Sequence, residues 1–125
     1  MKVMIIEDSD IVRIVFQNLL AQVRGAEVCG EFDSAASAIR ELANDTAKAP
    51  DAILLDIQLR SGNGMEVLKA VTANHPHIKV LVVTNFTDEL YRTRYLEAGA
   101  WGFFDKSRDL ALLRSSLQAL SARTS

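Results

Sequence analysis

The chain has 125 residues, the length of one ordinary domain, and 49% of them are hydrophobic while 24% are charged. This composition is typical of a compact globular protein and excludes the disordered and fibrous classes. The formal net charge is −2, so no basic field attracts nucleic acid, and we expect no direct nucleic-acid binding by this chain. We therefore predict a single domain over residues 1–125.

The sequence also argues against export and membrane insertion. Only four apolar residues precede Glu7 after the first two residues, which is too few for the core of a signal peptide. No apolar run approaches the roughly 18 residues of a membrane span. The single cysteine, Cys29, cannot form an internal disulfide, and we expect a small buried thiol there. We expect a cytoplasmic protein without membrane contact.

The first half of the chain reads as two strand and helix pairs. Residues 2–7 are a short apolar run typical of a buried strand. The next helix has Ser9 as its predicted N-cap and Gly25 as its stop. A second strand is expected over residues 26–32, and a second helix from Ser34 to the breaker cluster at residues 44–50. The apolar stripe of the first helix comprises Val12, Val15, Phe16, Leu19, Leu20 and Val23.

The second half continues the same alternation. A strand over residues 51–56 leads through a loop with Gly62 and Gly64 into a helix that ends before Pro76. Residues 78–84 form the most strand-like run, followed by a helix over residues 87–98. A short strand over residues 100–105 precedes a last helix, which we expect Ser107 to cap, and we expect the final five residues to fray.

Strands that alternate with helices in this way predict an α/β fold. The sheet should be parallel and doubly wound, with right-handed crossovers and helices on both faces. In such sheets, ligands bind beyond the carboxyl ends of the strands. We therefore look for function at that edge.

Five polar residues follow four of the predicted strands directly. Glu7 and Asp8 follow the first strand, Asp56 the third, Thr84 the fourth and Lys106 the fifth. Each alone has an ordinary explanation as a strand-ending polar residue. Together they place three carboxylates at one edge, where like charges repel unless a cation compensates them.

This set of groups suits phosphoryl transfer. Clustered carboxylates favour Mg²⁺, whereas His75 and His77 lie at the opposite edge without a nearby cysteine, which disfavours zinc. The carboxylate of Asp56 is a competent nucleophile for a phosphoryl group. A magnesium ion, the Lys106 ammonium and the Thr84 hydroxyl can each compensate one phosphoryl oxygen.

Residues 2–122 with this motif set resemble the receiver domain of response regulators in two-component signalling, a CheY-like family. The resemblance implies a flavodoxin-like (βα)5 fold with strand order 2-1-3-4-5. It also implies that Asp56 is the phospho-acceptor and that a histidine kinase or histidine phosphotransferase is the donor. The protein is then a switch that catalyses only its own modification. By resemblance, Mg²⁺ is bound by Asp8, Asp56 and the backbone carbonyl of Gln58, with Glu7 acting through water.

The family couples the threonine to an aromatic residue three positions before the lysine. That residue is Phe103, which has no hydroxyl, so we expect it to report the state of Asp56 by packing alone. Gly64 falls where the family has a glycine after the phosphorylated aspartate.

Three positions depart from the family pattern. Ser107 replaces the proline that often follows the lysine, and we expect a trans bond there because a cis bond before a non-proline residue costs about 2.5–4 kcal/mol. Arg60 stands where many members have proline, which suggests a more mobile loop. Asn85 follows Thr84 where small residues are usual, and it could narrow the access of water and small donors to Asp56.

Two sets of apolar residues lie outside the predicted core. Ile11 and Ile14 fall off the stripe of the first helix, close to Asp8, and either dock the phosphodonor or are ordinary exposed residues. Trp101, with Tyr91 and Tyr95, either anchors a partner or a homodimer or belongs to the core.

Three rival functions stay open at this point. A hydrolase with an aspartyl nucleophile usually wants a second acid two residues later, where Gln58 stands. A flavin or nucleotide binder should offer backbone amides to phosphate after its first strand, where Glu7 and Asp8 would repel it. A pseudo-receiver is the better account if Asp56 proves unreactive. Both a single-domain regulator and the receiver part of a longer DNA-binding regulator fit the sequence.

Overall fold

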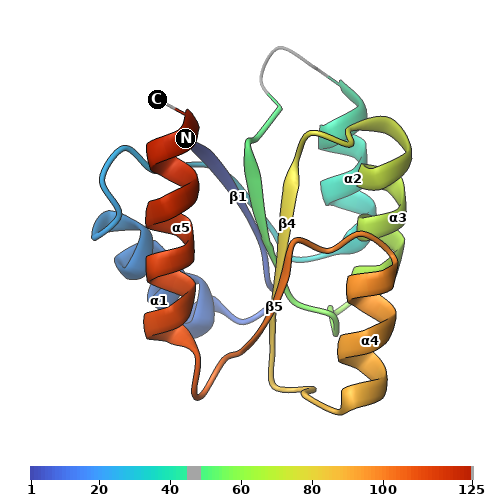
Figure 1. Cartoon of the computed structure of the whole chain (residues 1–125). Helices are drawn as coiled ribbons and strands as arrows, with labels where there is room; N and C mark the ends of the chain where they lie inside the picture. Colours follow the sequence, from blue (N-terminus) through green and yellow to red (C-terminus); the bar gives the residue numbers. More distant parts are fainter. Residues whose placement is uncertain (45–48, 125) are drawn as a thin grey trace.

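The computed structural model describes residues 1–44 and 49–124, and its described part contains one five-stranded parallel sheet of order β2-β1-β3-β4-β5 (Figure 1). Each strand is followed by a helix, which confirms the predicted doubly wound fold. The strands are β1 (Lys2–Ile6), β2 (Glu27–Phe32), β3 (Ala52–Leu55), β4 (Lys79–Thr84) and β5 (Gly102–Asp105). The helices are α1 (Asp10–Ala21), α2 (Ala35–Asn44), α3 (Gly64–Asn74), α4 (Glu89–Glu97) and α5 (Leu110–Thr124).

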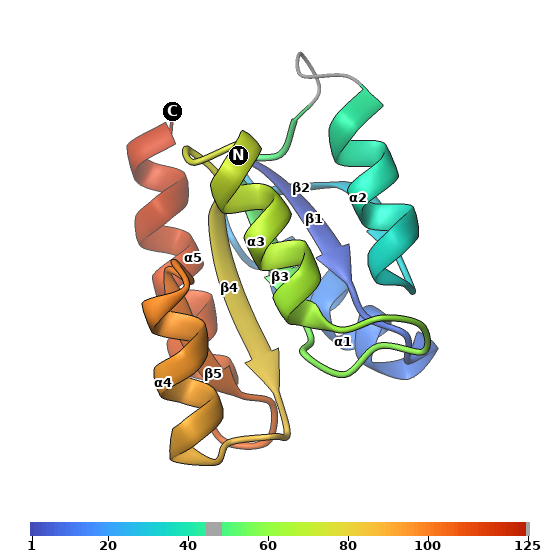
Figure 2. The same cartoon turned by 90° about the vertical axis from the view of Figure 1, so that its right-hand side faces the viewer.

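Helices cover both faces of the sheet and create two hydrophobic cores. Figures 1 and 2 show α1 and α5 on one face and α2, α3 and α4 on the other. Because strand side chains alternate between faces, Val3 and Ile5 pack in the core under α1 and α5, while Met4 and Ile6 pack in the other core. The central strands are therefore apolar along their whole length, as expected for a parallel sheet covered on both sides.

Cys29 is exposed, so the expectation of a buried thiol is wrong. Its strand, β2, pairs only with β1 and lies at the rim of the sheet, so most of its side chains reach solvent. The predicted apolar stripe of α1 is wrong at Val15. This residue is 39% exposed, since it borders a groove between α1 and α5. The buried stripe of α1 and the turn after it is Phe16, Leu19, Leu20 and Val23.

The helix boundaries follow local hydrogen bonds. Ser9 caps α1 as predicted, because its Oγ accepts from the Val12 amide at 3.3 Å. Ser107 does not cap α5: its hydroxyl donates to Asp105 Oδ1 at 2.6 Å, and the Leu113 amide donates to the carbonyl of Asp109 at 2.8 Å. The Lys106–Ser107 bond is trans, as expected.

The end of α5 also differs from expectation. The helix continues to Thr124, so fraying over the last five residues is wrong for residues 121–124. Ser121 anchors this end, since its buried hydroxyl donates to the Arg24 carbonyl at 2.7 Å. Residue 125 and residues 45–48 of the predicted breaker cluster lie outside the described residues. In the described part of the chain, no helix combines the length and apolar character needed to cross a bilayer.

Candidate phosphoryl-transfer site

The sheet fixes the backbone of the site one residue beyond each strand. The Glu7 amide donates to the Phe32 carbonyl at 2.9 Å, the Asp56 amide to the Ile6 carbonyl at 3.0 Å, and the Lys106 amide to the Thr84 carbonyl at 3.0 Å. These bonds continue the parallel ladders past the strand ends. The functional side chains therefore start from a rigid frame.

Lys106 is the cation that joins the site. Its Nζ lies 2.7 Å from Glu7 Oε2 and 3.0 Å from Asp56 Oδ2. Glu7 and Asp56 are both buried, and the lysine side chain is only 13% exposed. Burial shields these ion pairs from water and salt, which therefore screen their attraction only weakly.

Burial and charge perturb both members of the Glu7 and Lys106 pair. Burial raises the pKa of Glu7, the hydrogen bond from Lys106 offsets part of this, and the charge of Asp56 raises the pKa further. Burial pulls the pKa of Lys106 down, but hydrogen bonds and charges from Glu7 and Asp56 outweigh it, and the net pKa is raised. The ammonium is thus held in its charged form beside two carboxylates.

The acidic cluster fits a divalent cation. Oxygens of Glu7, Asp8 and Asp56 all lie within 4.8 Å of one another, and no other such group occurs among the described residues. The cluster brings three carboxyl groups together, and the ammonium of Lys106 pairs with two of them. Glu7 Oε2 is buried, and Lys106 is its one contact of this kind among the described residues. Hard oxygen donors with excess negative charge are what Mg²⁺ prefers.

Thr84 is fully buried at the end of β4, beside the strand end that carries Lys106. Its Oγ1 accepts a hydrogen bond from the Phe86 amide at 3.1 Å. Asn85, between them, is exposed. The threonine hydroxyl keeps its own proton available for donation, since a hydroxyl can accept and donate at once.

The loop after Asp56 is held close to the acceptor. The Gln58 amide lies 3.4 Å from Asp56 Oδ1, and the Gly64 amide donates to the Ile57 carbonyl at 3.0 Å. A Cβ on Gly64 would lie 2.8 Å from Ile57 Cα and 2.9 Å from the Asp56 carbonyl oxygen. The tight approach of the two backbone segments therefore requires glycine. Arg60 is exposed and lies 3.8 Å from an Asp33 oxygen across the loop.

Phe103 is buried in the core on the side of α4, where it packs against Tyr95 with ring centroids 6.2 Å apart. Tyr95 is also buried, so of the two alternatives for this residue the structure supports the core and not an outward face with Tyr91 and Trp101. Tyr91 remains exposed and contacts Phe86 edge to face. The four-residue spacing of the two tyrosines places them on one helix face. This spacing does not indicate that Tyr95 alone packs into the core.

The remaining candidates lie on the surface or far from the site. Ile11 is 75% exposed and Ile14 is 54% exposed, so both fall outside the core as predicted. Trp101 is 40% exposed, so its indole is only partly buried. At the other edge of the sheet, His75 is buried and contacts His77 edge to face.

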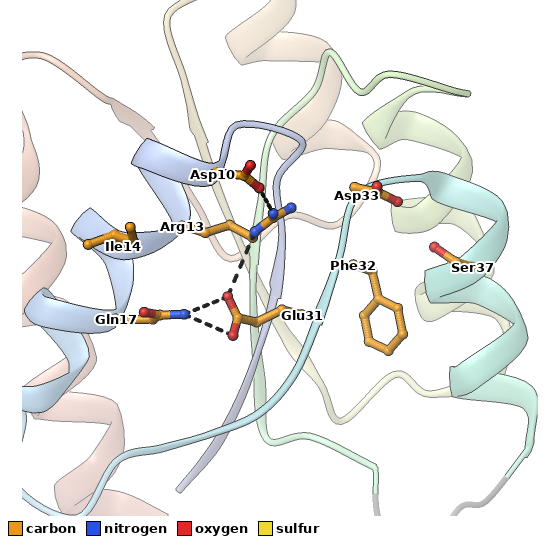
Figure 3. Close-up of a pocket in the computed structure, with 8 residues that line it drawn as sticks. All are labelled: Asp10, Arg13, Ile14, Gln17, Glu31, Phe32, Asp33 and Ser37. Atoms are coloured by element: carbon orange, nitrogen blue, oxygen red, sulfur yellow. Dashed lines mark hydrogen bonds and ion pairs between the residues drawn. The ribbon is translucent and has the colours of Figure 1, made fainter.

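Arg13 is a contributor that sequence patterns did not indicate. Its guanidinium donates to the Glu7 carbonyl at 2.9 Å and pairs with Asp10. Arg13 lines a pocket with a volume of about 630 Å³. Figure 3 shows that it also approaches Glu31, to which Gln17 donates two hydrogen bonds. Arg13 therefore braces the backbone of the acidic pair. A single arginine on a helix carries no sequence signal for this contact.

Comparisons with known proteins agree with this geometry. The family model of the response regulator receiver domain matches residues 3–118. The chain is 31% identical over 121 residues to "Response regulator GacA" of Pseudomonas syringae pv. syringae (strain B728a), covering 97% of this chain and 55% of the relative. It is 38% identical over 108 residues to "Transcriptional regulatory protein LnrK" of Bacillus subtilis (strain 168), covering 84% of this chain and 46% of the relative. The chain thus spans about half the length of these curated relatives.

A solved structure gives the same result for the fold. A LuxR-family two-component response regulator from Aurantimonas sp. SI85-9A1 superposes with a TM-score of 0.85 at 27% identity. The match covers 98% of this chain and 85% of that chain.

Proposed function

The chain belongs to the response regulator receiver family, and on that premise we propose that Asp56 accepts a phosphoryl group from a phosphohistidine on a histidine kinase or histidine phosphotransferase. Receiver domains are phosphorylation-dependent signalling switches of two-component systems and not catalytic enzymes that act on other molecules. The observation that carries the proposal is the position of the Asp56 carboxylate, 3.0 Å from the Lys106 ammonium and within the acidic cluster.

The proposed step exchanges one bond for another. A carboxylate oxygen of Asp56 attacks phosphorus, the P–N bond to the donor histidine breaks, and its electron pair stays on the imidazole. Lys106 is placed to pair with one phosphoryl oxygen, and the Thr84 hydroxyl to donate a hydrogen bond to another. Both groups are already oriented, Lys106 by its ion pairs and Thr84 by the Phe86 amide.

Asp8, Asp56 and the backbone carbonyl of Gln58 would hold Mg²⁺, with Glu7 acting through water. A bound Mg²⁺ supplies neutralisation of phosphoryl charge. Arg13, through the Glu7 carbonyl, keeps the backbone of the acidic pair in place.

Intact-mass spectrometry with phosphoramidate tests this proposal, because its P–N bond resembles that of phosphohistidine. We expect one phosphoryl adduct on the wild type that requires Mg²⁺ and is lost in Asp56→Asn. Asp51→Asn is the matched control, since Asp51 flanks the opposite end of β3 and binds the Lys2 amide. Persistence of the adduct in Asp56→Asn contradicts the proposal. If the wild type gains no adduct, a protein phosphohistidine donor decides, and failure there favours a pseudo-receiver.

We propose that Ile11 and Ile14, called the α1 apolar patch, dock the phosphodonor. Both are more than half exposed on the helix that begins two residues after Asp8. Ile11→Ala should slow transfer from a phosphohistidine-bearing phosphotransferase protein and leave transfer from phosphoramidate unchanged. Leu112→Ala on α5 is the control, because Leu112 is 57% exposed. Equal rates from the protein donor in Ile11→Ala and wild type would exclude this role.

We further propose that phosphorylation alters the surface near Phe103 and Trp101 and that Trp101 anchors a second copy of the chain. Phe103 lies in the core, and Trp101 reaches the surface two residues earlier along the chain. Sedimentation equilibrium with and without the phosphodonor tests the second copy. We expect self-association that increases with phosphorylation and weakens in Trp101→Ala; a monomer at all concentrations would rule it out.

A further inference from the structure

Tyr95 is the only buried residue of α4. Its hydroxyl contacts the loop after Asp56, and its ring contacts Phe103. Its side chain is 5% exposed and spans from the loop after Asp56 to the ring of Phe103. Nothing in the proposed transfer step uses this residue.

The hydroxyl end lies against the start of α3. It is 3.3 Å from the position that a Cβ on Gly64 would take, and the Asp56 carbonyl oxygen is 2.9 Å from that same position. The hydroxyl also faces the Met65 backbone, which offsets part of the rise that burial causes in the pKa of Tyr95. The hydroxyl is therefore packed against the backbone that directly follows the acceptor.

The Tyr95 hydroxyl lies against the first turn of α3. The first amides of a helix have no partner within the helix. Here the Gly64 amide donates to the Ile57 carbonyl at 3.0 Å, and the Glu66 amide to the Asn63 side chain at 3.1 Å. The Met65 backbone lies between them and faces the Tyr95 hydroxyl. A movement of the loop after Asp56 must therefore move or break the Tyr95 contact.

The ring end and its helix hold Phe103. The two rings pack at 6.2 Å between centroids with an interplanar angle of 51°. Arg92, on the same helix, donates from its guanidinium to the Phe103 carbonyl at 3.2 Å. Thus α4 holds Phe103 by both its ring and its backbone.

We propose that Tyr95 is a positioning residue that couples the loop after Asp56 to Phe103, in addition to the route through Thr84. The inference rests on the proposed phosphorylation of Asp56. Phe103 has no hydroxyl, so it can respond only by packing, and Tyr95 supplies the polar contact of this aromatic pair. Phosphorylation that shifts the loop would pull on the Tyr95 hydroxyl, and the ring of Tyr95 would carry the shift to Phe103.

The Tyr95→Phe variant separates coupling from packing, because it keeps the ring and removes only the hydroxyl. NMR of the ¹⁵N-labelled chain, with phosphoramidate and Mg²⁺, reports the Phe103 amide and the indole of the single tryptophan, Trp101. Intact mass on the same samples gives the phosphorylated fraction. Tyr91→Phe is the matched control, since it removes a tyrosine hydroxyl from the exposed side of the same helix.

We expect Tyr95→Phe to be phosphorylated as the wild type is, with the ratio of switched to unswitched Phe103 reduced about fivefold, the effect of one lost polar contact on a two-state equilibrium. Tyr91→Phe should match the wild type in both readouts. Equal Phe103 shifts in Tyr95→Phe and wild type at equal phosphorylation overturn the inference alone. Absence of phosphorylation in the wild type with both phosphoramidate and a protein phosphohistidine donor overturns the proposed function and this inference with it.

Discussion

The Phe86 amide donates a hydrogen bond to the hydroxyl of Thr84 over 3.1 Å. Thr84 is fully buried, so this bond orients its hydroxyl out of reach of solvent. It uses only the acceptor capacity of the hydroxyl, and the proton stays free for a phosphoryl oxygen. The loop between β4 and α4 is therefore tied to the same group that would sense phosphorylation.

The first prediction removes that hydroxyl. Thr84→Ala should still be phosphorylated, because Asp56, Lys106 and the acidic cluster are unchanged, but the shift of the Phe103 amide on phosphorylation should be largely lost. NMR at a matched phosphorylated fraction measures this. Thr84→Ser, which restores a hydroxyl, should recover most of the shift. A full Phe103 response in Thr84→Ala would show that the coupling does not pass through Thr84.

A second prediction concerns Glu7 and pH. Because burial raises its pKa above the ordinary 4.5, folding favours the protonated form. The corresponding contribution to stability is complete below the unfolded pKa and is lost as the pH rises through the folded pKa. The free energy of unfolding of the wild type minus that of Glu7→Gln should therefore fall between pH 4 and pH 7, measured by urea unfolding.

The control for this series is Glu41→Gln, an exposed glutamate on α2. The difference between wild type and Glu41→Gln should stay flat over the same range. A difference for Glu7→Gln that grows with pH would mean that the ion pair with Lys106 outweighs burial.

The third prediction is stabilisation by Mg²⁺. At a concentration about 100 times the dissociation constant, a ligand that binds only the folded state stabilises it by about 2.7 kcal/mol. Thermal unfolding of the wild type should shift upward with MgCl₂, and Asp8→Asn should abolish most of the shift. Asp10→Asn should retain it, since Asp10 is exposed and lies outside the acidic cluster. Equal shifts in the two variants would place the ion elsewhere.

The fourth prediction tests the close backbone approach at Gly64. A Cβ there meets backbone atoms of Ile57 and Asp56 that cannot rotate away, so Gly64→Ala should lower the free energy of unfolding by about 1–3 kcal/mol. Gly30→Ala is the control, because its Cβ would meet only the ring of Phe32. We expect a change below about 1 kcal/mol there in urea unfolding. A neutral Gly64→Ala would show that the loop relaxes freely.

Much of the fold and the placement of the site could be predicted from sequence because both follow from strong local patterns. The apolar runs before Glu7, Asp56 and Thr84 mark the strands unambiguously. Parallel strands share one carboxyl edge, so the polar residues that end them must converge. The contacts of Lys106 with Glu7 and Asp56 are the direct result.

What the sequence predicted wrongly or left open concerns orientation at the periphery. Cys29 sits in an apolar segment, but strand order, which places β2 at the rim, decides its exposure. Tyr95 and Tyr91 lie one helical turn apart, and only the docking of α4 on the sheet decides which turns inward. Ser107 does not cap α5 because its hydroxyl and its amide both donate to Asp105. Each outcome depends on specific contacts in the folded chain that apolar and polar spacing does not reveal.

The identity of the phosphorylated residue is the central claim, and chemical trapping tests it most directly. The wild type is incubated with phosphoramidate and Mg²⁺ and then treated with borohydride, which reduces an aspartyl phosphate to homoserine, and the peptides are sequenced by mass spectrometry. We predict homoserine at position 56 and no reduction of Glu7 or Asp8. Homoserine at any other aspartate, with position 56 unmodified, would contradict the account.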